Sequence, residues 1–304
     1  MHRIVVYTQG IALACRGTKI KEICLNEKVS CFDLVPGHGP EPGRLRRLRK
    51  RLRFLRPRRF LRRVLFRRGT GSTSTPAELT TVEAGKLIMS TNAAFPPYEM
   101  TDDSGNVVGI DAEIAGAIAD KLGLELVIDD MDFDAAQLAV QQGKSDICMA
   151  GLSVTEDRLL VMDFSDSYAT GIQVVIVPEG SDVTLDNLGE QLIGTQRATT
   201  GNIYCTDDYG EDHVIAYDDG IVAVQDLLNG KVDAVVIDKA PAQEFVAANP
   251  GLVILDTEYA NEDYAIGVAK GNTALVDAVN GALAELTADG TIQSIIEKYI
   301  PAEG

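Results

Sequence analysis

The amino-acid sequence predicts an α/β protein whose sheet is mostly parallel and covered by helices. Two observations support this fold class. Apolar segments of strand length alternate with amphipathic segments of helix length, first over residues 87–149 and again over residues 174–299. In addition, the segment Gln142-Gly143-Lys144-Ser145-Asp146-Ile147 is echoed by Asn229-Gly230-Lys231-Val232-Asp233-Ala234, each between a short helix and an apolar strand. The echo suggests two similar α/β units.

The first unit contains three expected strands and two expected helices. Residues 87–89, 124–128 and 146–149 are apolar and short enough to be buried strands. Ile110, Ile114, Ile118 and Leu122 recur every four residues, which predicts a helix that Asp111 caps and Gly123 ends. A shorter helix is expected from Asp134, as its cap, to residue 142.

The second unit repeats this alternation. Strands are expected at residues 174–177, 192–195, 233–237 and 264–269. A helix should place Ile221, Val224 and Leu228 on one buried face and end at residues 229–230. Two closing helices are expected at residues 275–286 and 292–299, the second stopping before Pro301.

Charge divides the chain near residue 75. The whole chain has 28 basic and 45 acidic residues, a net charge of −17. Residues 1–75 contain 19 of the basic and 4 of the acidic residues, which leaves residues 76–304 with a net charge of −32. Such acidity disfavours nucleic acid and anionic membrane surfaces as partners of the second part. Its 229 residues suffice for one large core or two lobes.

Residues 1–75 form an arginine-rich leader with three open interpretations. Between Arg44 and Arg68 nearly every second residue is arginine, and Pro57 interrupts any long helix. The segment could be a basic arm for nucleic acid or membrane, or a disordered tail. It could also be an export signal read out of frame, followed by the Gly-Ser-Thr linker of residues 69–75. No export signal is recognisable, because residues 1–14 lack a compact apolar region.

The cysteine and histidine residues give little evidence for a reactive thiol, a disulfide or a metal site. Cys148 lies in an apolar strand, as a small hydrophobic residue would, and a disulfide between Cys148 and Cys205 is only weakly supported. His213 is the one histidine of residues 76–304 and is expected at the surface, so no metal site or cofactor is predicted. No apolar run reaches the roughly 18 residues that span a bilayer.

The clearest functional candidate is Arg158, one of only two arginines in residues 76–304. A guanidinium matches a carboxylate with two parallel hydrogen bonds. Gly151 and Ser153, just upstream, would add an open backbone N–H and a hydroxyl to the same anion site. The alternative is a surface arginine paired with Glu156 or Asp157.

An opposite charge is expected at the second unit. Ligands of open α/β sheets bind at the carboxyl ends of strands. The strand at 146–149 leads to Gly151 and Ser153, and the strand at 233–237 leads to Asp238. Arg158 for a carboxylate and Asp238 for an ammonium together describe a clamp for a zwitterion such as a free amino acid.

Residues 83–300 resemble the extracytoplasmic solute-binding proteins of polar amino acid ABC importers. The resemblance rests on several segments that are weak singly and specific in this order. They are Ser90-Thr91-Asn92-Ala93-Ala94-Phe95-Pro96-Pro97-Tyr98-Glu99, Gly109-Ile110-Asp111-Ala112-Glu113-Ile114, Met131-Asp132-Phe133-Asp134, Ala150 to Arg158, Met162-Asp163-Phe164-Ser165-Asp166-Ser167-Tyr168, Thr199-Thr200-Gly201, Gly230 to Asp238 and Ala288-Asp289-Gly290-Thr291.

The resemblance implies a two-lobed periplasmic-binding-protein-like fold of type II. In it, two doubly wound mixed sheets are joined by two hinge strands, here residues 170–173 and 261–265. Lobe 1 would comprise residues 80–170 and 266–304, and lobe 2 residues 174–261. The lobes of this family close over the ligand by hinge bending.

The resemblance also assigns roles within the cleft. Arg158, Ser153 and backbone N–H groups would bind the α-carboxylate, and Thr199 and Thr200 would reach it from lobe 2. Asp238 would pair with the α-ammonium, helped by the carbonyl of Gly151. Phe95 and Phe133 would sandwich the ligand side chain, and Asn92 would touch its far end. Each has a structural alternative: the phenylalanines as core, Asp238, Ser153 and the threonines as helix caps.

Departures from the family pattern bear on the ligand. Ala198 stands where a glycine is usual, Arg197 where a small residue is usual, and Gln196 where some members have a cationic contact. Arg197 could reach the cleft or point to solvent. Asn92 replaces the acid found in binders of basic amino acids, and an amide cannot neutralise a cation. The expected ligand is therefore a neutral or polar amino acid.

Three functions are compatible with the sequence. The first is a non-catalytic, monomeric binding protein that delivers an amino acid to an ABC permease in the membrane, periplasmic or extracellular and anchored as a lipoprotein. The second is a cyclohexadienyl or arogenate-type dehydratase on the same fold, with Glu99 or Asp102 as acid or base. The third, a receptor module, would need a further signalling domain.

Overall fold

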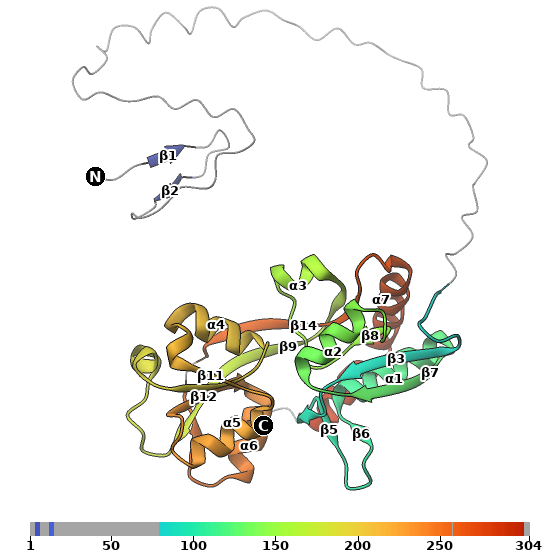
Figure 1. The fold of residues 1–304 in the computed structure, drawn as a ribbon. Helices are drawn as coiled ribbons and strands as arrows, with labels where there is room; N and C mark the ends of the chain where they lie inside the picture. The colour runs from blue at the N-terminus through green and yellow to red at the C-terminus, as the bar shows by residue number, and fades with distance from the viewer. Residues whose placement is uncertain (1–3, 7–11, 15–78, 257, 301–304) are drawn as a thin grey trace, which may run out of the picture. The chain divides into compact units, whose positions relative to one another are not determined.

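The computed structural model describes residues 4–6, 12–14, 79–256 and 258–300 (Figure 1). The described residues belong to two units. The first contains an antiparallel pair of strands, β1 (Ile4–Val6) and β2 (Ala12–Ala14). The arginine-rich segment 44–68, the linker 69–75 and the cysteines Cys15, Cys24 and Cys31 lie outside the described residues.

The second unit is built on one continuous mixed sheet. Its strands follow the order β11-β10-β12-β9-β14-β8-β3-β7, and β13 pairs with β9. Neighbours are parallel within each end of the sheet and antiparallel around β9 and β14. The bounds are β3 (Lys86–Thr91), β7 (Glu125–Asp130), β8 (Ile147–Cys148), β9 (Met162–Pro178), β10 (Ile193–Gln196), β11 (Val214–Tyr217), β12 (Ala234–Asp238), β13 (Leu252–Ile254) and β14 (Ala260–Ala269).

The sheet has two halves, and each half is covered by its own group of helices (Figure 1). The first half joins β3, β7 and β8 to α1 (Ile110–Leu122), α2 (Phe133–Gln141), α3 (Glu156–Val161), α7 (Thr273–Ala288) and α8 (Thr291–Tyr299). The second half joins β10 to β13 to α4 (Thr200–Tyr209), α5 (Gly220–Leu228), α6 (Lys239–Ala248) and the 3-10 turns η1 (Leu185–Glu190) and η2 (Glu211–His213). A small antiparallel sheet, β4 (Ala94–Phe95), β5 (Glu99–Thr101) and β6 (Val107–Val108), precedes α1.

Two long strands connect the halves. β9 spans 17 residues and pairs with β12 and β13 of the second half as well as with β14. Gln173 lies opposite Ala260 and Ala169 opposite Tyr264, so the expected hinge segments 170–173 and 261–265 are paired with each other. The two predicted sheets are therefore the two ends of one sheet. The lobe boundaries remain predictions.

Some expectations about helix starts were wrong. Asp111 does not cap α1: Gly109 is the N-cap, and the buried Asp111 carboxylate bonds elsewhere. Asp134 does not cap α2 either, because the helix starts two residues earlier than predicted, at Phe133, with Asp132 at the N-cap position. In both cases an acid in the first turn was mistaken for the cap, since both positions favour acidic residues.

The predicted buried face of α5 was right for Val224 and wrong for Ile221 and Leu228. Ile221 and Leu228 are 41% and 47% exposed, whereas Ala223, Val224 and Leu227 are buried. A Cβ at Gly220 would meet Ile237 Cδ1 at 2.5 Å, so small residues face the sheet at the start of this helix. The close approach of helix and strand selects the face, and larger apolar residues are left outside.

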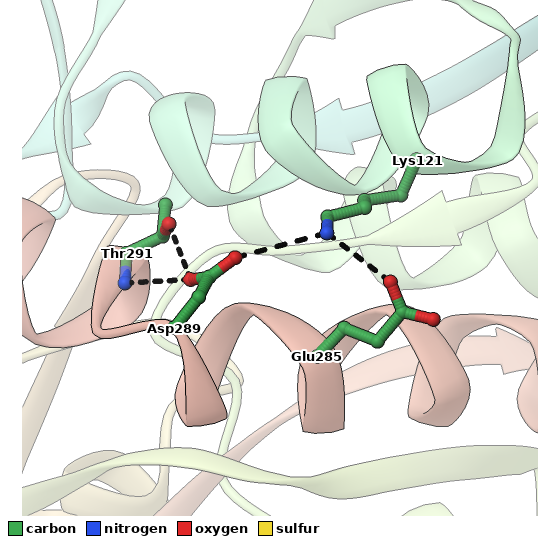
Figure 2. A network of polar contacts seen from close by, with 4 residues as sticks. All are labelled: Lys121, Glu285, Asp289 and Thr291. Atoms are coloured by element: carbon green, nitrogen blue, oxygen red, sulfur yellow. Dashed lines mark hydrogen bonds and ion pairs between the residues drawn. The ribbon is translucent and has the colours of Figure 1, made fainter.

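A polar cluster joins α1 to the turn between α7 and α8 (Figure 2). Lys121 Nζ donates to Glu285 Oε2 at 3.1 Å and lies 3.7 Å from Asp289 Oδ2. Asp289 Oδ1 accepts from the backbone N–H of Thr291 at 3.0 Å and from its hydroxyl at 2.6 Å. The Ala288-Asp289-Gly290-Thr291 motif is thus a turn tied to α1. Because Lys121 is exposed, the ion pairs themselves add little stability.

Both cysteines of the second unit are free and buried, so no disulfide joins Cys148 and Cys205. Burial raises the pKa of each thiol to about 12. Both are packing residues, as expected for Cys148.

Candidate functional site

A small cavity of about 10 Å³ lies between the two halves. All nine predicted site residues line it, although they come from separate places in the sequence. The lining consists of Asn92, Phe95, Phe133, Gly151, Ser153, Arg158, Thr199, Thr200 and Asp238, together with Glu99, Ala150 and Gln196. The structure therefore brings together all the residues of the predicted binding site. That they bind a ligand remains a prediction.

Arg158 enters this cavity from α3 and is only 6% exposed. Nη1 donates to the carbonyl of Ser153 at 2.7 Å, and Nη2 donates across the cavity to the carbonyl of Ala198 at 3.0 Å. The guanidinium lies 5.5 Å from the ring centroid of Phe133. A surface pair with Glu156 or Asp157 is not what positions it. The two carbonyls use two of its five N–H groups, which leaves donors for an anion.

Hydroxyl groups from both halves surround the arginine. Ser153 Oγ and Thr200 Oγ1 both donate to Glu262 Oε2, at 2.9 Å and 2.8 Å. Thr199 is the N-cap of α4: its Oγ1 accepts from the N–H of Asn202 at 3.2 Å and donates to the Gln196 carbonyl at 2.7 Å. The capping alternative therefore holds for Thr199. The positive end of the α4 dipole adds to an anion-favouring environment.

Gly151 differs from its predicted role. Its backbone N–H is not open, because it donates to Asp111 Oδ2 at 2.9 Å. The residue has φ of +54°, and a Cβ there would meet Phe95 Cε1 at 2.7 Å. Glycine is required for the backbone and for the phenylalanine packed against it. Asp111 also accepts from Tyr168 Oη at 2.7 Å, and burial raises its pKa to about 6.

Amide side chains bridge the halves next to the aromatic residues. Gln196 Nε2 donates to Asn92 Oδ1 at 2.9 Å, and Asn92 Nδ2 donates to the carbonyl of Met131 at 3.2 Å. Phe95 and Phe133 are each 6% exposed. Because Phe133 also contacts the Arg158 guanidinium, it positions that group as well as lining the cavity.

Asp238 provides the negative charge of the second half. It stands at the N-cap position of α6 but makes no capping bond with its side chain, which accepts instead from Tyr264 Oη. Burial raises its pKa to about 7, and the charge of Glu262 adds to this, while the tyrosine bond opposes it. An ammonium group of a ligand would supply the countercharge that this buried carboxyl requires to ionise.

Glu99 is a cavity residue whose position the sequence did not predict. It is fully buried, no N–H or hydroxyl of the described residues donates to it, and its carboxyl group lies against that of Asp111. Burial first, and then the negative charge of Asp111, raise its pKa well above the usual range. The only signal in the sequence is an acid directly after Phe95-Pro96-Pro97-Tyr98, which made it a candidate acid or base. Asp102, the other candidate, bonds to the N–H groups of Ser104 and Asn106 in its own turn.

Arg197 and Ala198, which depart from the family pattern, lie in different surroundings. Arg197 points to solvent and pairs with Asp218 Oδ1 at 2.8 Å, with half of its side chain exposed. Ala198 has φ of 60°, the left-handed region that favours the glycine usual in the family. Its carbonyl receives the Arg158 bond, so this strained residue holds the arginine across the cavity.

Within the residues that the structure describes, no group of three or more His, Cys, Asp or Glu side chains could hold a metal ion. His213 is half-buried, and its Nδ1 lies 3.2 Å from the carbonyl of Gln191. No helix among the described residues is long and apolar enough to cross a membrane.

Comparison with solved structures supports the two-lobed fold. An ancestral arginine-binding protein bound to glutamine is 38% identical, with a TM-score of 0.68, over 72% of this chain and 99% of that chain. The arginine-, lysine-, histidine-binding protein ArtJ from Geobacillus stearothermophilus is 32% identical, with a TM-score of 0.68, over 72% of this chain and 96% of its own. The fold is thus a type II periplasmic-binding-protein fold.

Curated relatives agree with the structural comparison. The probable histidine-binding protein of Neisseria gonorrhoeae is 30% identical over 242 residues, which cover 77% of this chain and 90% of that protein. The ABC transporter arginine-binding protein 1 of Escherichia coli is 30% identical over 223 residues, which cover 72% and 92%. The model of the bacterial extracellular solute-binding proteins, family 3, matches residues 87–302. On its sequence, fold and site, this chain belongs to the bacterial extracellular solute-binding proteins of family 3.

Proposed function

We propose that this protein binds a free amino acid between its two halves and delivers it to an ABC permease. One observation supports this best: a buried cavity holds Arg158 from the first half and Asp238 from the second. A zwitterion satisfies both charges only when both halves contact it. That differential affinity would favour the closed arrangement and so link binding to hinge motion.

The carboxylate end of the ligand would lie at Arg158, within reach of Ser153 and Thr200. The ammonium end would lie at Asp238, where a positive charge lowers the free-energy cost of ionising a buried carboxyl. Phe95 and Phe133 would flank the side chain. These roles follow the family resemblance, and their support here is that all of these groups line one cavity.

The side chain of the ligand would be neutral and polar. Asn92 and Gln196 offer amide donors and acceptors, and Glu99 lines the cavity beside Asp111. With its raised pKa, a protonated Glu99 can donate to Asp111 and accept at its other oxygen, where the N–H of a carboxamide would fit. The relatives are named for histidine, arginine and cystine, and one similar structure holds glutamine. We therefore take glutamine as the first ligand to test.

The protein would act without catalysis, as a monomer held outside the cytoplasmic membrane by a lipid anchor. Its relatives are named as binding proteins. A dehydratase would need an acid or base at the leaving group, and Glu99 lines the cavity whereas Asp102 does not. The dehydratase alternative therefore rests on a single residue.

The test is thermal unfolding of the full chain with each of the twenty amino acids, ornithine, cystine, prephenate and arogenate. A compound at about 100 times its Kd should add about 2.7 kcal/mol to the free energy of unfolding and raise the midpoint by several degrees. Stabilisation by glutamine or another neutral polar amino acid supports the proposal. Tighter binding of arginine or lysine than of glutamine would contradict the ligand class. Stabilisation and turnover of the cyclic carboxylates alone would contradict the function.

A further inference from the structure

Glu262 lies on the crossing strand β14, opposite Gly171 of β9, and is only 9% exposed. Its Oε2 accepts three hydrogen bonds: from Ser153 Oγ at 2.9 Å, from Thr200 Oγ1 at 2.8 Å and from Gln173 Nε2 at 3.1 Å. The three donors come from the first half, the second half and β9. A single oxygen on the crossing strand therefore gathers polar groups from both halves.

The position of this carboxylate conflicts with the proposed binding of an amino acid. Ser153 and Thr200 are the two hydroxyls proposed to receive the ligand carboxylate, and each hydroxyl has only one proton to donate. While both protons point to Glu262, the hydroxyls present lone pairs toward the cavity. A carboxylate placed there would meet those lone pairs and a second negative charge nearby.

Glu262 itself does not line the cavity, so it acts through the two hydroxyls. Its other oxygen, Oε1, has no hydrogen-bond partner among the described residues. If Ser153 and Thr200 turn toward a ligand, Glu262 loses two of the three hydrogen bonds at Oε2 and keeps the Gln173 amide, with the Tyr204 hydroxyl nearby. Leaving a buried carboxylate with fewer donors costs free energy, and this cost subtracts from the affinity of the ligand.

We propose that Glu262 is a positioning residue that competes with the ligand carboxylate for the protons of Ser153 and Thr200 and thereby limits the affinity for amino acids. This inference rests on the proposed function. The competition for protons involves the carboxylate end, because the hydroxyls of Ser153 and Thr200 donate to Glu262, whereas its charge acts on Asp238 only at longer range. A ligand that lacks the carboxylate does not compete with Glu262 for these protons.

The test compares E262Q with wild type by isothermal titration, using glutamine and 4-aminobutanamide, which is glutamine without its α-carboxylate. The amide introduced by E262Q carries no charge, and its NH2 group can donate to a hydroxyl that then donates to the ligand. We expect the affinity of E262Q for glutamine to rise about tenfold, the effect of about one hydrogen bond to a charged group. Affinity for 4-aminobutanamide should rise clearly less than affinity for glutamine, because that compound has no carboxylate to gain the freed protons and depends on Glu262 only through its charge near Asp238.

Two further variants make the result specific. D263N removes a negative charge from the neighbouring, exposed position of β14 and should bind glutamine as wild type does. E262M, which has similar volume and no charge, should also tighten glutamine binding, and it replaces E262Q if that variant does not fold.

Equal or weaker glutamine binding by a folded E262Q or E262M would overturn the inference and indicate a purely structural role. Equal tightening of 4-aminobutanamide would also overturn it, because the effect would not depend on the carboxylate. If glutamine does not bind, the same titrations use the amino acid that stabilises wild type most and its decarboxylated amine. If wild type and both variants bind no amino acid, the proposed function itself fails, and the inference with it.

Discussion

The two halves of the second unit build the same local frame from the echoed sequence segments. In the first half, the N–H of Asp146 donates to the carbonyl of Ile88, and the carboxylate of Asp146 accepts the N–H of Ile88, both at 2.8 Å. In the second half, Asp233 makes the same two bonds with Leu192, at 2.8 and 2.9 Å. The Gly-Lys turn before each aspartate has a positive φ at Gly143 and Gly230. Both halves therefore use the same glycine turn and the same pair of aspartate hydrogen bonds to the neighbouring strand.

The halves differ in the chain segment that leaves the framed strand. After β8 the chain passes Gly151 and Ser153 and reaches Arg158 on α3, whereas β12 ends at Asp238 and enters α6 directly. The same frame therefore presents a cation on one side of the cavity and an acid on the other. Under the proposed function, these opposite charges would select a molecule that carries both charges, and the experiments below test this comparison.

The largest effect is expected for Arg158→Ala, which removes the cation of the first half. The carboxylate of a bound amino acid would lose its buried partner, so binding should weaken by roughly 3–5 kcal/mol. Isothermal titration with the best amino acid of the panel measures the loss. Arg197→Ala is the matched control, because that arginine is exposed and paired with Asp218. Near-normal binding by Arg158→Ala, or an equal loss in the control, would refute the assignment.

Removal of the acid of the second half, Asp238→Asn, should weaken binding by about 2 kcal/mol through loss of a charged hydrogen bond to the ammonium. The effect should vary with pH. Because the pKa of Asp238 is about 7 in the folded protein, binding of an ammonium must release a proton at lower pH. Wild-type affinity should therefore fall as the pH falls from about 7 to about 5, and the variant should show a flatter profile in the same titrations.

The raised pKa of Asp238 also predicts the direction in which stability changes with pH. An unfolded aspartate has a pKa of about 4, so between about pH 4 and 7 the folded carboxyl holds a proton that the unfolded chain has lost. Its contribution makes the free energy of unfolding fall as the pH rises through this window. Urea unfolding of both proteins, measured without amino acid, should show a smaller fall for Asp238→Asn. Parallel curves would contradict the raised pKa.

The two aspartates of the shared frame should contribute differently to stability, and the variants Asp146→Asn and Asp233→Asn measure this difference. The Asp146 carboxylate is buried and accepts two backbone N–H groups, from Val82 and Ile88. Asp233 is exposed and accepts one, from Leu192. We expect Asp146→Asn to lose about 1–3 kcal/mol of stability in urea unfolding and Asp233→Asn clearly less. Equal losses would mean that the two frames are energetically equivalent.

The smallest effect is expected for Ala198→Gly. The residue has φ of 60°, which costs a residue with a Cβ roughly 1–2 kcal/mol relative to glycine. Part of this gain is lost to the greater freedom of glycine in the unfolded chain, so the variant should be about 1 kcal/mol more stable. Thermal unfolding measures the shift, with Ala240→Gly in α6 as a control that should destabilise. A destabilised Ala198→Gly would show that the backbone here is not strained.

Much of the site could be predicted because its residues follow the carboxyl ends of strands in each half, and these ends face each other across the cavity. Arg158 stood out through the scarcity of arginine, and Asp238 through its place after an apolar strand. The errors share a cause. Asp111 was expected to cap a helix and Gly151 to offer a free N–H, yet the two bond to each other across 40 residues. Patterns over a few residues cannot predict which distant group satisfies a buried donor.

The sequence by itself determined the alternation of strands and helices, the break in charge near residue 75 and the residue types of the site. These depend on hydrophobic period and local chemistry, which are encoded within short windows. The tertiary structure decided which face of α5 is buried, that Glu99 is buried against Asp111, and that Glu262 accepts hydrogen bonds from two hydroxyls of the site. Burial and hydrogen-bond partnership depend on groups distant in the chain, so only the assembled fold determines them.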